Sequence, residues 1–329
     1  MSGDRARVVV TRRLYPFLVE ELRAAYALDD NQDDMPLAPA DLARRLAPAD
    51  GALLVAGERI DEALLAACPR LKVVANVAVG YNNLDLAACT RHGVVATNTP
   101  DVLNESVADH GFALLLAAAR RLGESERWVR AGHWQRWTFD MFPGADLHHR
   151  TLGIIGMGRI GRALARRAAG FAMRVVYHNR TRLPEAEEGG ATWLAKDELL
   201  RQADHVILMV PYSAAAHHLI GAADLALMKP TAVLVNLARG GVVDDAALLQ
   251  ALRERRIAAA GLDVFEGEPA LNPGFLQLDN VVLTPHIASS TRATREAMAR
   301  LAMQNLAEAL AGRQPPSLLN PEVWAHRGR

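Results

Sequence analysis

Three side chains with complementary chemistry, Arg239, Glu268 and His286, each follow a separate short apolar segment of this sequence. An arginine fork binds a carboxylate through two parallel hydrogen bonds and polarises a nearby carbonyl. A histidine donates a proton near neutral pH, and a carboxylate beside it favours the imidazolium. Together they suit hydride transfer to a keto acid. Singly, they also fit a helix-start arginine, a loop charge and a buried histidine with satisfied hydrogen bonds.

A glycine motif supplies a binding site for the hydride carrier. Gly156-Met157-Gly158-Arg159-Ile160-Gly161 follows the apolar run 151–155 and precedes a helix-forming segment at 162–170. In such a motif the first glycine allows a tight turn and the second lets the backbone approach a pyrophosphate. The third glycine permits close packing, and the helix start offers free N–H donors. We therefore predict a strand, a dinucleotide-binding turn and a helix, with a plain glycine-rich turn as the alternative.

The end of the next apolar run, 174–177, predicts the type of dinucleotide. An acidic residue at this point would hold the ribose 2′-hydroxyl of NAD, but the sequence reads His178-Asn179-Arg180-Thr181-Arg182. An arginine fork, a second cation and a hydroxyl complement a 2′-phosphate. We therefore expect NADP(H) to be preferred, with NAD(H) as the alternative cofactor. A solvated basic turn is the competing interpretation.

Short apolar runs alternate with segments of helical length, which is typical of parallel sheets covered on both faces. We expect an α/β fold with two doubly wound parallel sheets. The expected strands are 8–11, 51–55, 71–76 and 94–97, then 152–155, 174–177, 205–210, 232–236, 258–262 and 281–283. Between the two series, 103–122 is apolar almost all round, so a buried helix is expected there. The aromatic segment 128–142 fits an interface anchor and ordinary packing equally well.

Composition narrows the class of protein. The 329 residues suit two domains, and the 37 basic residues equal the 37 acidic ones, so nothing indicates a nucleic-acid partner. No segment approaches the roughly 18 apolar residues of a membrane span. Cys68 and Cys89 are too few for a disulfide framework and lack metal-ligand spacing. We expect a cytoplasmic protein with a small-molecule substrate, no membrane partner and no metal.

An ordered set of motifs resembles the D-isomer-specific 2-hydroxyacid dehydrogenase family, and within it the bacterial glyoxylate/hydroxypyruvate reductases that also reduce 2-ketogluconate. The matching segments cover nearly the whole chain and are 77–85, 98–103, 148–161, 236–240, 261–269 and 284–291. The resemblance implies a Rossmann NAD(P)-binding domain at 101–286. It also implies a discontinuous, flavodoxin-like substrate domain at 1–100 and 287–329, with a cleft between the two.

The resemblance also implies roles for individual residues. Arg239, Glu268 and His286 would be the catalytic trio. The backbone of Val79 and Gly80 would hold the substrate carboxylate, with Ser289 nearby. The further cofactor contacts would be Pro211, Leu237, Ala238 and Asp263, the last facing the nicotinamide carboxamide. A homodimer would form on the 103–122 helix, and one of Trp134, Trp137 or Phe142 would reach the partner's pocket.

By the same resemblance, the expected reaction is NADPH-dependent reduction of glyoxylate, hydroxypyruvate or 2-ketogluconate to the D-2-hydroxy acid, with His286 as the proton donor. Two other functions share these motifs. A phosphoglycerate dehydrogenase would need further cations near its substrate phosphate, and residues 76–81 contain none. A nucleotide-sensing corepressor would bind the dinucleotide without turnover.

Overall fold

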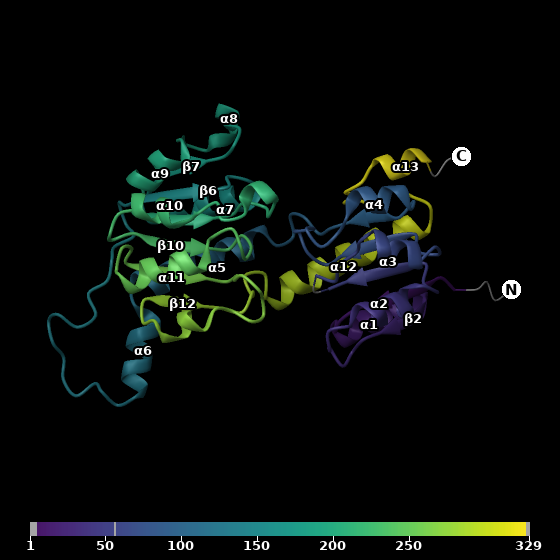
Figure 1. Cartoon of the computed structure of the whole chain (residues 1–329), viewed down its shortest axis with the longest axis horizontal. Helices are drawn as coiled ribbons and strands as arrows, with labels where there is room; N and C mark the ends of the chain where they lie inside the picture. Colours follow the sequence, from purple (N-terminus) through teal and green to yellow (C-terminus); the bar gives the residue numbers. More distant parts are fainter. Residues whose placement is uncertain (1–4, 56, 327–329) are drawn as a thin grey trace. The chain divides into compact units, whose positions relative to one another are not determined.

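The computed structural model describes residues 5–55 and 57–326. The chain forms two compact units, one comprising residues 1–103 and 291–329 and the other residues 104–290. We call them the terminal unit and the central unit (Figure 1). The sequence analysis expected the two domain boundaries after residues 100 and 286. In the structure the boundaries follow Leu103 and Ser290.

The terminal unit is built on a parallel five-stranded sheet in the order β2-β1-β3-β4-β5. This is a doubly wound order. The strands are β1 (Arg7–Val10), β2 (Ala27–Asp30), β3 (Gly51–Leu54), β4 (Val73–Asn76) and β5 (Val95–Thr97). The sequence analysis did not predict β2, because its residues Ala-Leu-Asp-Asp have low strand propensity. It is an edge strand, where charged residues are common.

Helices cover the sheet of the terminal unit. They are α1 (Pro16–Ala25), α2 (Pro39–Leu46), α3 (Glu62–Ala67), α4 (Leu86–Arg91), α12 (Arg292–Leu310) and α13 (Glu322–His326). The long α12, predicted at 291–312, packs on β3, β4 and β5. Asn305 on α12 is buried and donates a hydrogen bond to the carbonyl of Asn98 at 3.0 Å. The C-terminal segment therefore completes the fold begun by the first hundred residues.

The central unit has a seven-stranded parallel sheet in the order β12-β11-β10-β9-β6-β7-β8. The strands are β6 (Thr151–Ile155), β7 (Arg174–His178), β8 (Thr192–Trp193), β9 (His205–Leu208), β10 (Val233–Asn236), β11 (Ala259–Leu262) and β12 (Val281–Leu283). Strands β9, β10 and β11 are buried along their whole length, which explains their continuous apolar sequences. Strand order reverses between β6 and β9, where a parallel sheet offers a crevice for a ligand.

Helices lie on both faces of this sheet (Figure 1). They are α5 (Asn104–Ala119), α6 (Leu122–Arg130), α7 (Arg159–Ala169), α8 (Glu185–Glu188), α9 (Lys196–Gln202), α10 (Ala222–Leu227) and α11 (Asp245–Arg253), with short 3-10 turns at Ala214–Ala216 and Pro273–Gln277. The apolar α5 packs against α7, β10 and β11. The prediction of a buried helix is therefore confirmed.

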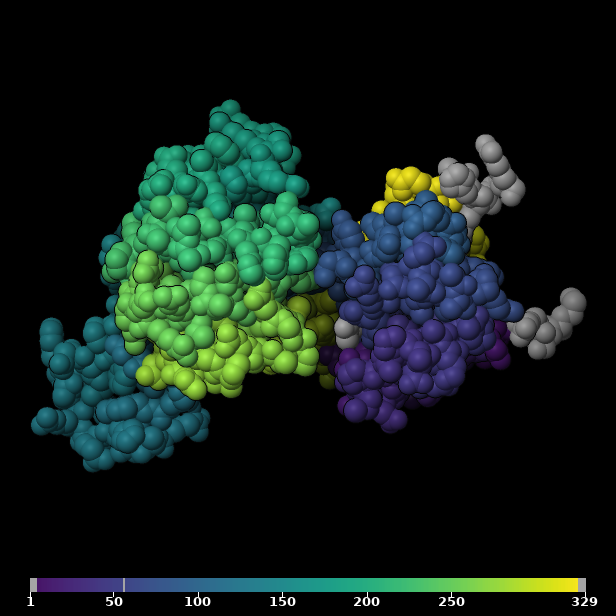
Figure 2. All heavy atoms as spheres, in the orientation of Figure 1, coloured from purple at the N-terminus to yellow at the C-terminus, as the bar shows by residue number. Residues whose placement is uncertain are grey.

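An arm formed by α6 and the following segment, up to Asp146, extends from the body of the central unit (Figure 2). Trp128 packs edge-on against Phe142 at 5.5 Å between ring centroids, and the Arg121 guanidinium lies over Phe142. Three other aromatic side chains, Trp134, Trp137 and Phe139, are exposed. Part of the aromatic segment therefore packs internally, and part forms an exposed apolar surface.

No helix in the described part of the chain is long and apolar enough to cross a membrane. Cys68 and Cys89 are free, buried thiols. Burial raises the pKa of both groups, that of Cys89 to about 12, so neither is a reactive thiolate at neutral pH.

Candidate active site

The glycine motif lies at the point where strand order reverses in the central unit. Gly156 follows β6 with φ +106°, and a Cβ there would lie 2.6 Å from the backbone carbonyl of Met209, which follows β9. A Cβ on Gly161 would lie 2.4 Å from the carbonyl oxygen of Gly156. A Cβ on Gly158 would meet nothing within 4 Å. The turn is therefore tight where the chain packs and open where a pyrophosphate would approach, so these residues fit a dinucleotide.

The end of β7 is tied to the glycine turn through Asn179. Its side-chain oxygen accepts a hydrogen bond from the Met157 amide at 2.7 Å, and its carbonyl accepts one from the Trp193 indole at 3.1 Å. The sequence analysis assigned Asn179 to the cofactor but did not predict this link. The segment 179–181 is therefore held beside the turn that would bind the pyrophosphate.

The two arginines after β7 differ in their surroundings. Arg182 pairs with Glu188 at 2.8 Å, and Glu188 also accepts a hydrogen bond from the buried Tyr177 hydroxyl. Arg180 is exposed and makes no hydrogen bond or ion pair among the residues that the structure describes. The sequence analysis treated Arg182 as a second free cation for a 2′-phosphate. That expectation was wrong, because Arg182 is paired with Glu188. Arg180 and the exposed Thr181 are the side chains of this segment that remain available to a 2′-phosphate.

Glu268 and His286 form a directly hydrogen-bonded pair. Nδ1 of His286 lies 2.8 Å from one oxygen of Glu268, and the other oxygen accepts the Phe265 amide at 2.9 Å. Both side chains are partly exposed, at 47% for His286 and 33% for Glu268, so a substrate can reach them. With Nδ1 oriented toward Glu268, Nε2 is the ring nitrogen available to a substrate. The loops after β11 and β12 thus meet, as the sequence analysis expected.

The charge state of Glu268 follows from these contacts. Burial alone would raise the pKa of this carboxyl, but the hydrogen bonds from His286 and the Phe265 amide, with the charges of His286 and Arg239, lower it overall. Glu268 is therefore an anion at neutral pH. An anion at this position can accept a hydrogen bond from Nδ1 of His286.

Arg239 follows β10 and is half-buried. Its Nη1 donates to the Ala238 carbonyl at 2.7 Å. Burial lowers the pKa of Arg239 and the charge of Glu268 opposes that shift, so the two side chains influence each other electrostatically. A guanidinium remains charged despite such a shift. The local backbone is fixed by Asn236, whose side chain accepts from the Ala238 amide at 3.0 Å.

Asp263 fixes the turn that carries His286. Its buried carboxylate accepts from the Thr284 hydroxyl at 2.7 Å, the Ile287 amide at 2.8 Å and the Ala288 amide at 2.9 Å. His110 on α5 supports the same group through Thr284 at 3.1 Å. His286 itself has φ +54°, a conformation that non-glycine residues adopt only when surrounding structure holds them there. This positioning role was not predicted from the sequence.

In the terminal unit, Val79 and Gly80 follow β4 in a loop held by two asparagine side chains. Asn98 donates to the Val79 carbonyl and Asn76 to the Gly80 carbonyl, each at 2.8 Å. Within the described residues, the amides of Val79 and Gly80 have no protein acceptor. Adjacent free N–H groups of this kind bind anions. The sequence analysis noted Asn76 only as the end of an expected strand and Asn98 only as part of a motif, and it gave neither a role.

The remaining predicted residues line the same loops of the central unit. Pro211 is exposed after β9, Leu237 and Ala238 are buried after β10, and Ser289 is half-buried in the turn after His286. Every predicted residue of this unit therefore follows the carboxyl end of a strand of one sheet, where ligands bind in doubly wound folds.

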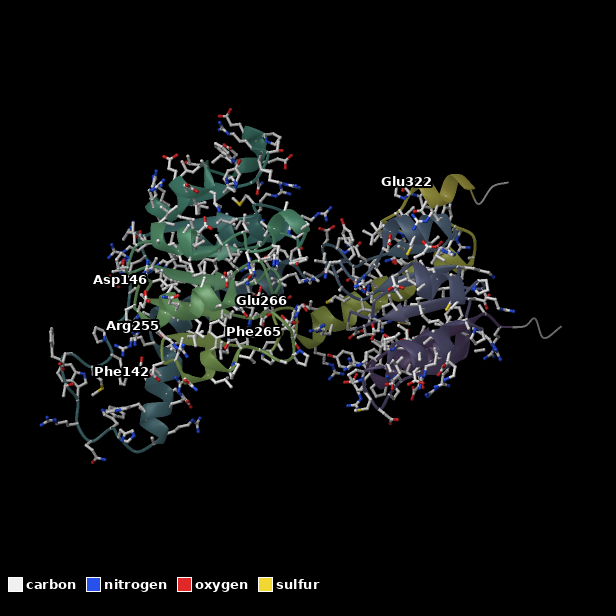
Figure 3. All side chains as sticks on the ribbon, viewed as in Figure 1. Phe142, Asp146, Arg255, Phe265, Glu266 and Glu322 are labelled. Atoms are coloured by element: carbon white, nitrogen blue, oxygen red, sulfur yellow. The ribbon has the colours of Figure 1, made fainter. Side chains whose placement is uncertain are left out.

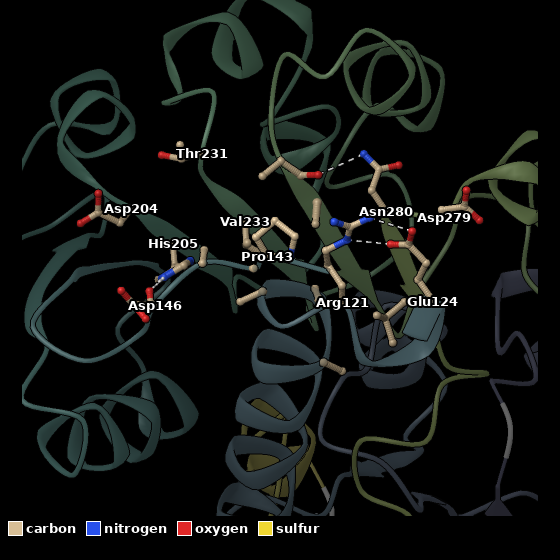
Figure 4. Close-up of a pocket in the computed structure, with 18 of the residues that line it drawn as sticks. Arg121, Glu124, Pro143, Asp146, Asp204, His205, Thr231, Val233, Asp279 and Asn280 are labelled. Atoms are coloured by element: carbon tan, nitrogen blue, oxygen red, sulfur yellow. Dashed lines mark hydrogen bonds and ion pairs between the residues drawn. The ribbon is translucent and has the colours of Figure 1, made fainter. Parts of the chain in front are cut away.

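A cavity of about 660 Å³ lies at the other end of that sheet, where the strands begin (Figure 4). Its lining includes His205 and Val233, which begin β9 and β10, together with Arg121 and Glu124 of the arm. Figure 3 shows Phe142, Asp146 and Arg255 on that side, away from Phe265 and Glu266. The cavity therefore does not belong to the candidate active site.

Comparison with known proteins agrees with this geometry. Residues 112–288 match the family described as D-isomer specific 2-hydroxyacid dehydrogenase, NAD binding domain. A glyoxylate reductase from Thermococcus onnurineus is 47% identical over 324 residues, which cover 97% of both chains.

Solved structures are similar over the same extent. An NADPH-dependent glyoxylate/hydroxypyruvate reductase from Sinorhizobium meliloti, in complex with NADP and malonate, is 35% identical with a TM-score of 0.86, covering 97% of this chain and 98% of that one. A glyoxylate reductase from Paecilomyes thermophila is 31% identical with a TM-score of 0.86, covering 96% and 99%. This chain is an NAD(P)-dependent oxidoreductase, and it belongs to the D-isomer specific 2-hydroxyacid dehydrogenase family.

Proposed function

We propose that this enzyme reduces glyoxylate and hydroxypyruvate to the corresponding 2-hydroxy acids with NADPH, and that it also accepts 2-ketogluconate. The observation that carries the proposal is the 2.8 Å pair of Glu268 and His286 on the loops after β11 and β12, with Arg239 on the loop after β10 of the same sheet. When bound, the reduced nicotinamide supplies a hydride to the keto carbon. The residues of this chain supply the proton, the orientation and the charge.

His286 is the proton donor in this proposal. Glu268 holds Nδ1 and stabilises the positive charge, so the proton on Nε2 is the one given to the substrate oxygen. The carbonyl carbon gains a hydride and its oxygen gains a proton, which yields the hydroxyl group. Glu268 remains ionised throughout, because its pKa is lowered.

Substrate orientation is assigned to Arg239 and to the loop of Val79 and Gly80. The guanidinium of Arg239 binds the carboxylate and polarises the carbonyl. The free amides of Val79 and Gly80 bind carboxylate oxygens, which assigns substrate binding to residues 1–103 and 291–329. Ser289 lies three residues after His286 and completes the polar contacts.

Cofactor binding is assigned to two groups of residues in the central unit. Residues 156–161 bind the pyrophosphate, and Asn179, Arg180 and Thr181 bind the adenosine end with its 2′-phosphate. Pro211, Leu237 and Ala238 line the nicotinamide end. Among the described residues, Oδ2 of Asp263 accepts a hydrogen bond only from the Ala288 amide, so this oxygen has a lone pair left for the carboxamide.

We further propose a cytoplasmic homodimer. The two buried free thiols suit a reducing compartment. The arm exposes Trp134 and Trp137, at 58% and 72%, and large exposed apolar side chains of this kind mark protein interfaces. Phe142 packs within its own chain, so Trp134 or Trp137 is the better candidate to reach the partner. Equilibrium sedimentation of the wild type and Trp137→Ala tests this assignment.

A substrate and cofactor panel tests the proposed reaction. NADPH and NADH oxidation would be measured with glyoxylate, hydroxypyruvate, 2-ketogluconate and 3-phosphohydroxypyruvate. The proposal predicts the highest kcat/KM with glyoxylate or hydroxypyruvate and NADPH. A preference for the phosphorylated acid would indicate a phosphoglycerate dehydrogenase, and tight NADPH binding without turnover of any acid would indicate a nucleotide-binding regulator.

A further inference from the structure

A group of metal-ligating side chains that the proposed reaction does not use lies on two loops of the central unit. His217 and His218 follow the 3-10 turn after β9, and Glu266 is on the loop after β11, labelled in Figure 3. One ligand atom from each of the three lies within 4.8 Å of the others. Both histidines are exposed, so a metal ion in solution can reach them.

The donor atoms are those that Zn²⁺ and similar transition metals prefer. Two imidazoles and a carboxylate form the ligand set of an open zinc site, with one position left for water. Metal–ligand bonds near 2.1 Å place tetrahedral donors about 3.4 Å apart. Nε2 of His218 lies 2.5 Å from Oε1 of Glu266, so these two atoms are closer together than two ligands of one metal ion would be. Separation of these atoms by about an ångström would admit the metal.

Surrounding groups favour a cation at this position. Nδ1 of His218 lies 3.8 Å from Asp244, which is ion-pair range but too long for a hydrogen bond, so a small movement would let this carboxylate orient His218. The Tyr212 hydroxyl lies 3.2 Å from Nδ1 of His217. The Glu266 amide donates to the buried Asp245 at 3.0 Å. The carboxyl groups of Asp244, Asp245 and Glu266 therefore lie near the two histidines.

We propose that His217, His218 and Glu266 form a binding site for a divalent transition metal, with Asp244 orienting His218. This site is separate from the catalytic trio. It is connected to that trio because Glu266 precedes Glu268 by two residues in the same loop. Metal binding would join the loops after β9 and β11 and so restrain the loop that holds the partner of His286.

Titration of the metal-free, full-length enzyme tests the proposal. Zn²⁺ binding would be measured by calorimetry, and Co²⁺ binding by the visible absorption of a tetrahedral complex. The expected result is one site per chain. His218→Gln and Glu266→Gln should each lower the affinity by at least about tenfold, and Asp244→Asn by roughly tenfold. Asparagine can still cap α11 at position 244, so the last variant limits damage to the fold.

The matched control is His92→Gln, because His92 forms a similar pair with Glu62 at 2.6 Å in the terminal unit. Its Zn²⁺ affinity should equal that of the wild type. Wild-type protein without a saturable site, or variants with wild-type affinity and a wild-type melting temperature, would overturn the proposal. Because no substrate is needed, a failed metal titration is distinct from a failure of the proposed reaction.

Discussion

The loop after β7 and the loops after β10, β11 and β12 follow strands of the same sheet. They hold their polar side chains in different ways. After β7, Arg180 is exposed and has no hydrogen-bond or ion-pair partner among the described residues. After β11 and β12, Asp263, Glu268 and His286 are joined by short hydrogen bonds to one another's loops. The polar side chain after β7 is therefore open to a ligand, whereas those after β11 and β12 are already held by protein hydrogen bonds.

This difference separates selection of the cofactor from chemistry on the substrate. An exposed arginine gains its hydrogen bonds only when an anion binds, so its contribution appears as binding affinity. A fixed donor and carboxylate are in position before the substrate arrives, so their contribution appears mainly in the rate of the chemical step. Substitutions in the two regions should therefore affect different kinetic constants.

The largest effect is expected for His286→Ala. Loss of the proton donor should lower kcat by about 10²–10⁴-fold. Binding of NADPH, measured by quenching of protein fluorescence, should remain within about twofold of the wild type, since His286 is not part of the glycine turn. His92→Gln, remote in the sequence and on the terminal unit, is the control. A variant with wild-type kcat would rule out His286 as the donor.

The next effect is expected for Asp263→Ala, which removes the acceptor for the turn that carries His286. Leaving buried donors unsatisfied should lower the free energy of unfolding by about 3 kcal/mol, measured by urea titration. We also expect kcat to fall with the loss of the geometry at His286. Asp263→Asn keeps one acceptor oxygen, so its free energy of unfolding should lie between those of the wild type and Asp263→Ala. Unchanged stability of Asp263→Ala would refute the positioning role.

Glu268→Gln should have a smaller effect, because glutamine keeps a hydrogen-bonding oxygen but loses the charge. The difference between a charged and a neutral hydrogen bond is about 1 kcal/mol, so kcat should fall roughly 5- to 10-fold. Steady-state kinetics with glyoxylate and NADPH measure this fall. A variant with wild-type kcat would mean that the charge of Glu268 does not contribute to turnover.

Glu268 also has a predictable effect on stability. Because its pKa is lowered by folding, the stabilisation it provides is present above the pKa of the unfolded chain. That stabilisation is lost as the pH falls through the folded value, below the ordinary range of a glutamate. Activity near pH 6 should therefore not be limited by protonation of Glu268.

The smallest effect on turnover is expected for Arg180→Ala. Loss of a charge-assisted hydrogen bond, worth about 1.5–3 kcal/mol, should raise the KM for NADPH by roughly 10- to 100-fold and leave the KM for NADH nearly unchanged. Arg182→Ala is the matched control, since Arg182 is paired with Glu188. Equal losses with both cofactors would show that Arg180 does not read the 2′-phosphate.

The sequence predicted most of the architecture, because buried parallel strands such as β9 and β10 have continuous apolar sequences. It missed β2 and the two-residue β8, which carry little apolar pattern. It also did not separate α6 from the aromatic segment that follows. The ends of elements and short edge strands depend on tertiary packing, which a local pattern does not record.

For the candidate site, the sequence predicted side chains by type and by their place after a strand. Apart from the pair of Glu268 and His286, it could not predict their partners. The pairing of Arg182 with Glu188 depends on the fold of the 182–189 turn. The hydrogen bonds of Asp263 to Ile287 and Ala288 join loops 24 and 25 residues apart. An asparagine or aspartate immediately after a strand was the available signal for such roles.

Steady-state kinetics of four proteins would test the separation of the two regions most directly. These are the wild type, Arg180→Ala, His286→Ala and the double variant, each with glyoxylate and both cofactors. The account predicts that Arg180→Ala raises only the KM for NADPH and that His286→Ala lowers kcat with both cofactors. The two free-energy changes should add in the double variant within about 0.5 kcal/mol. Wild-type turnover in His286→Ala, or an NADH defect in Arg180→Ala as large as the NADPH defect, would contradict it.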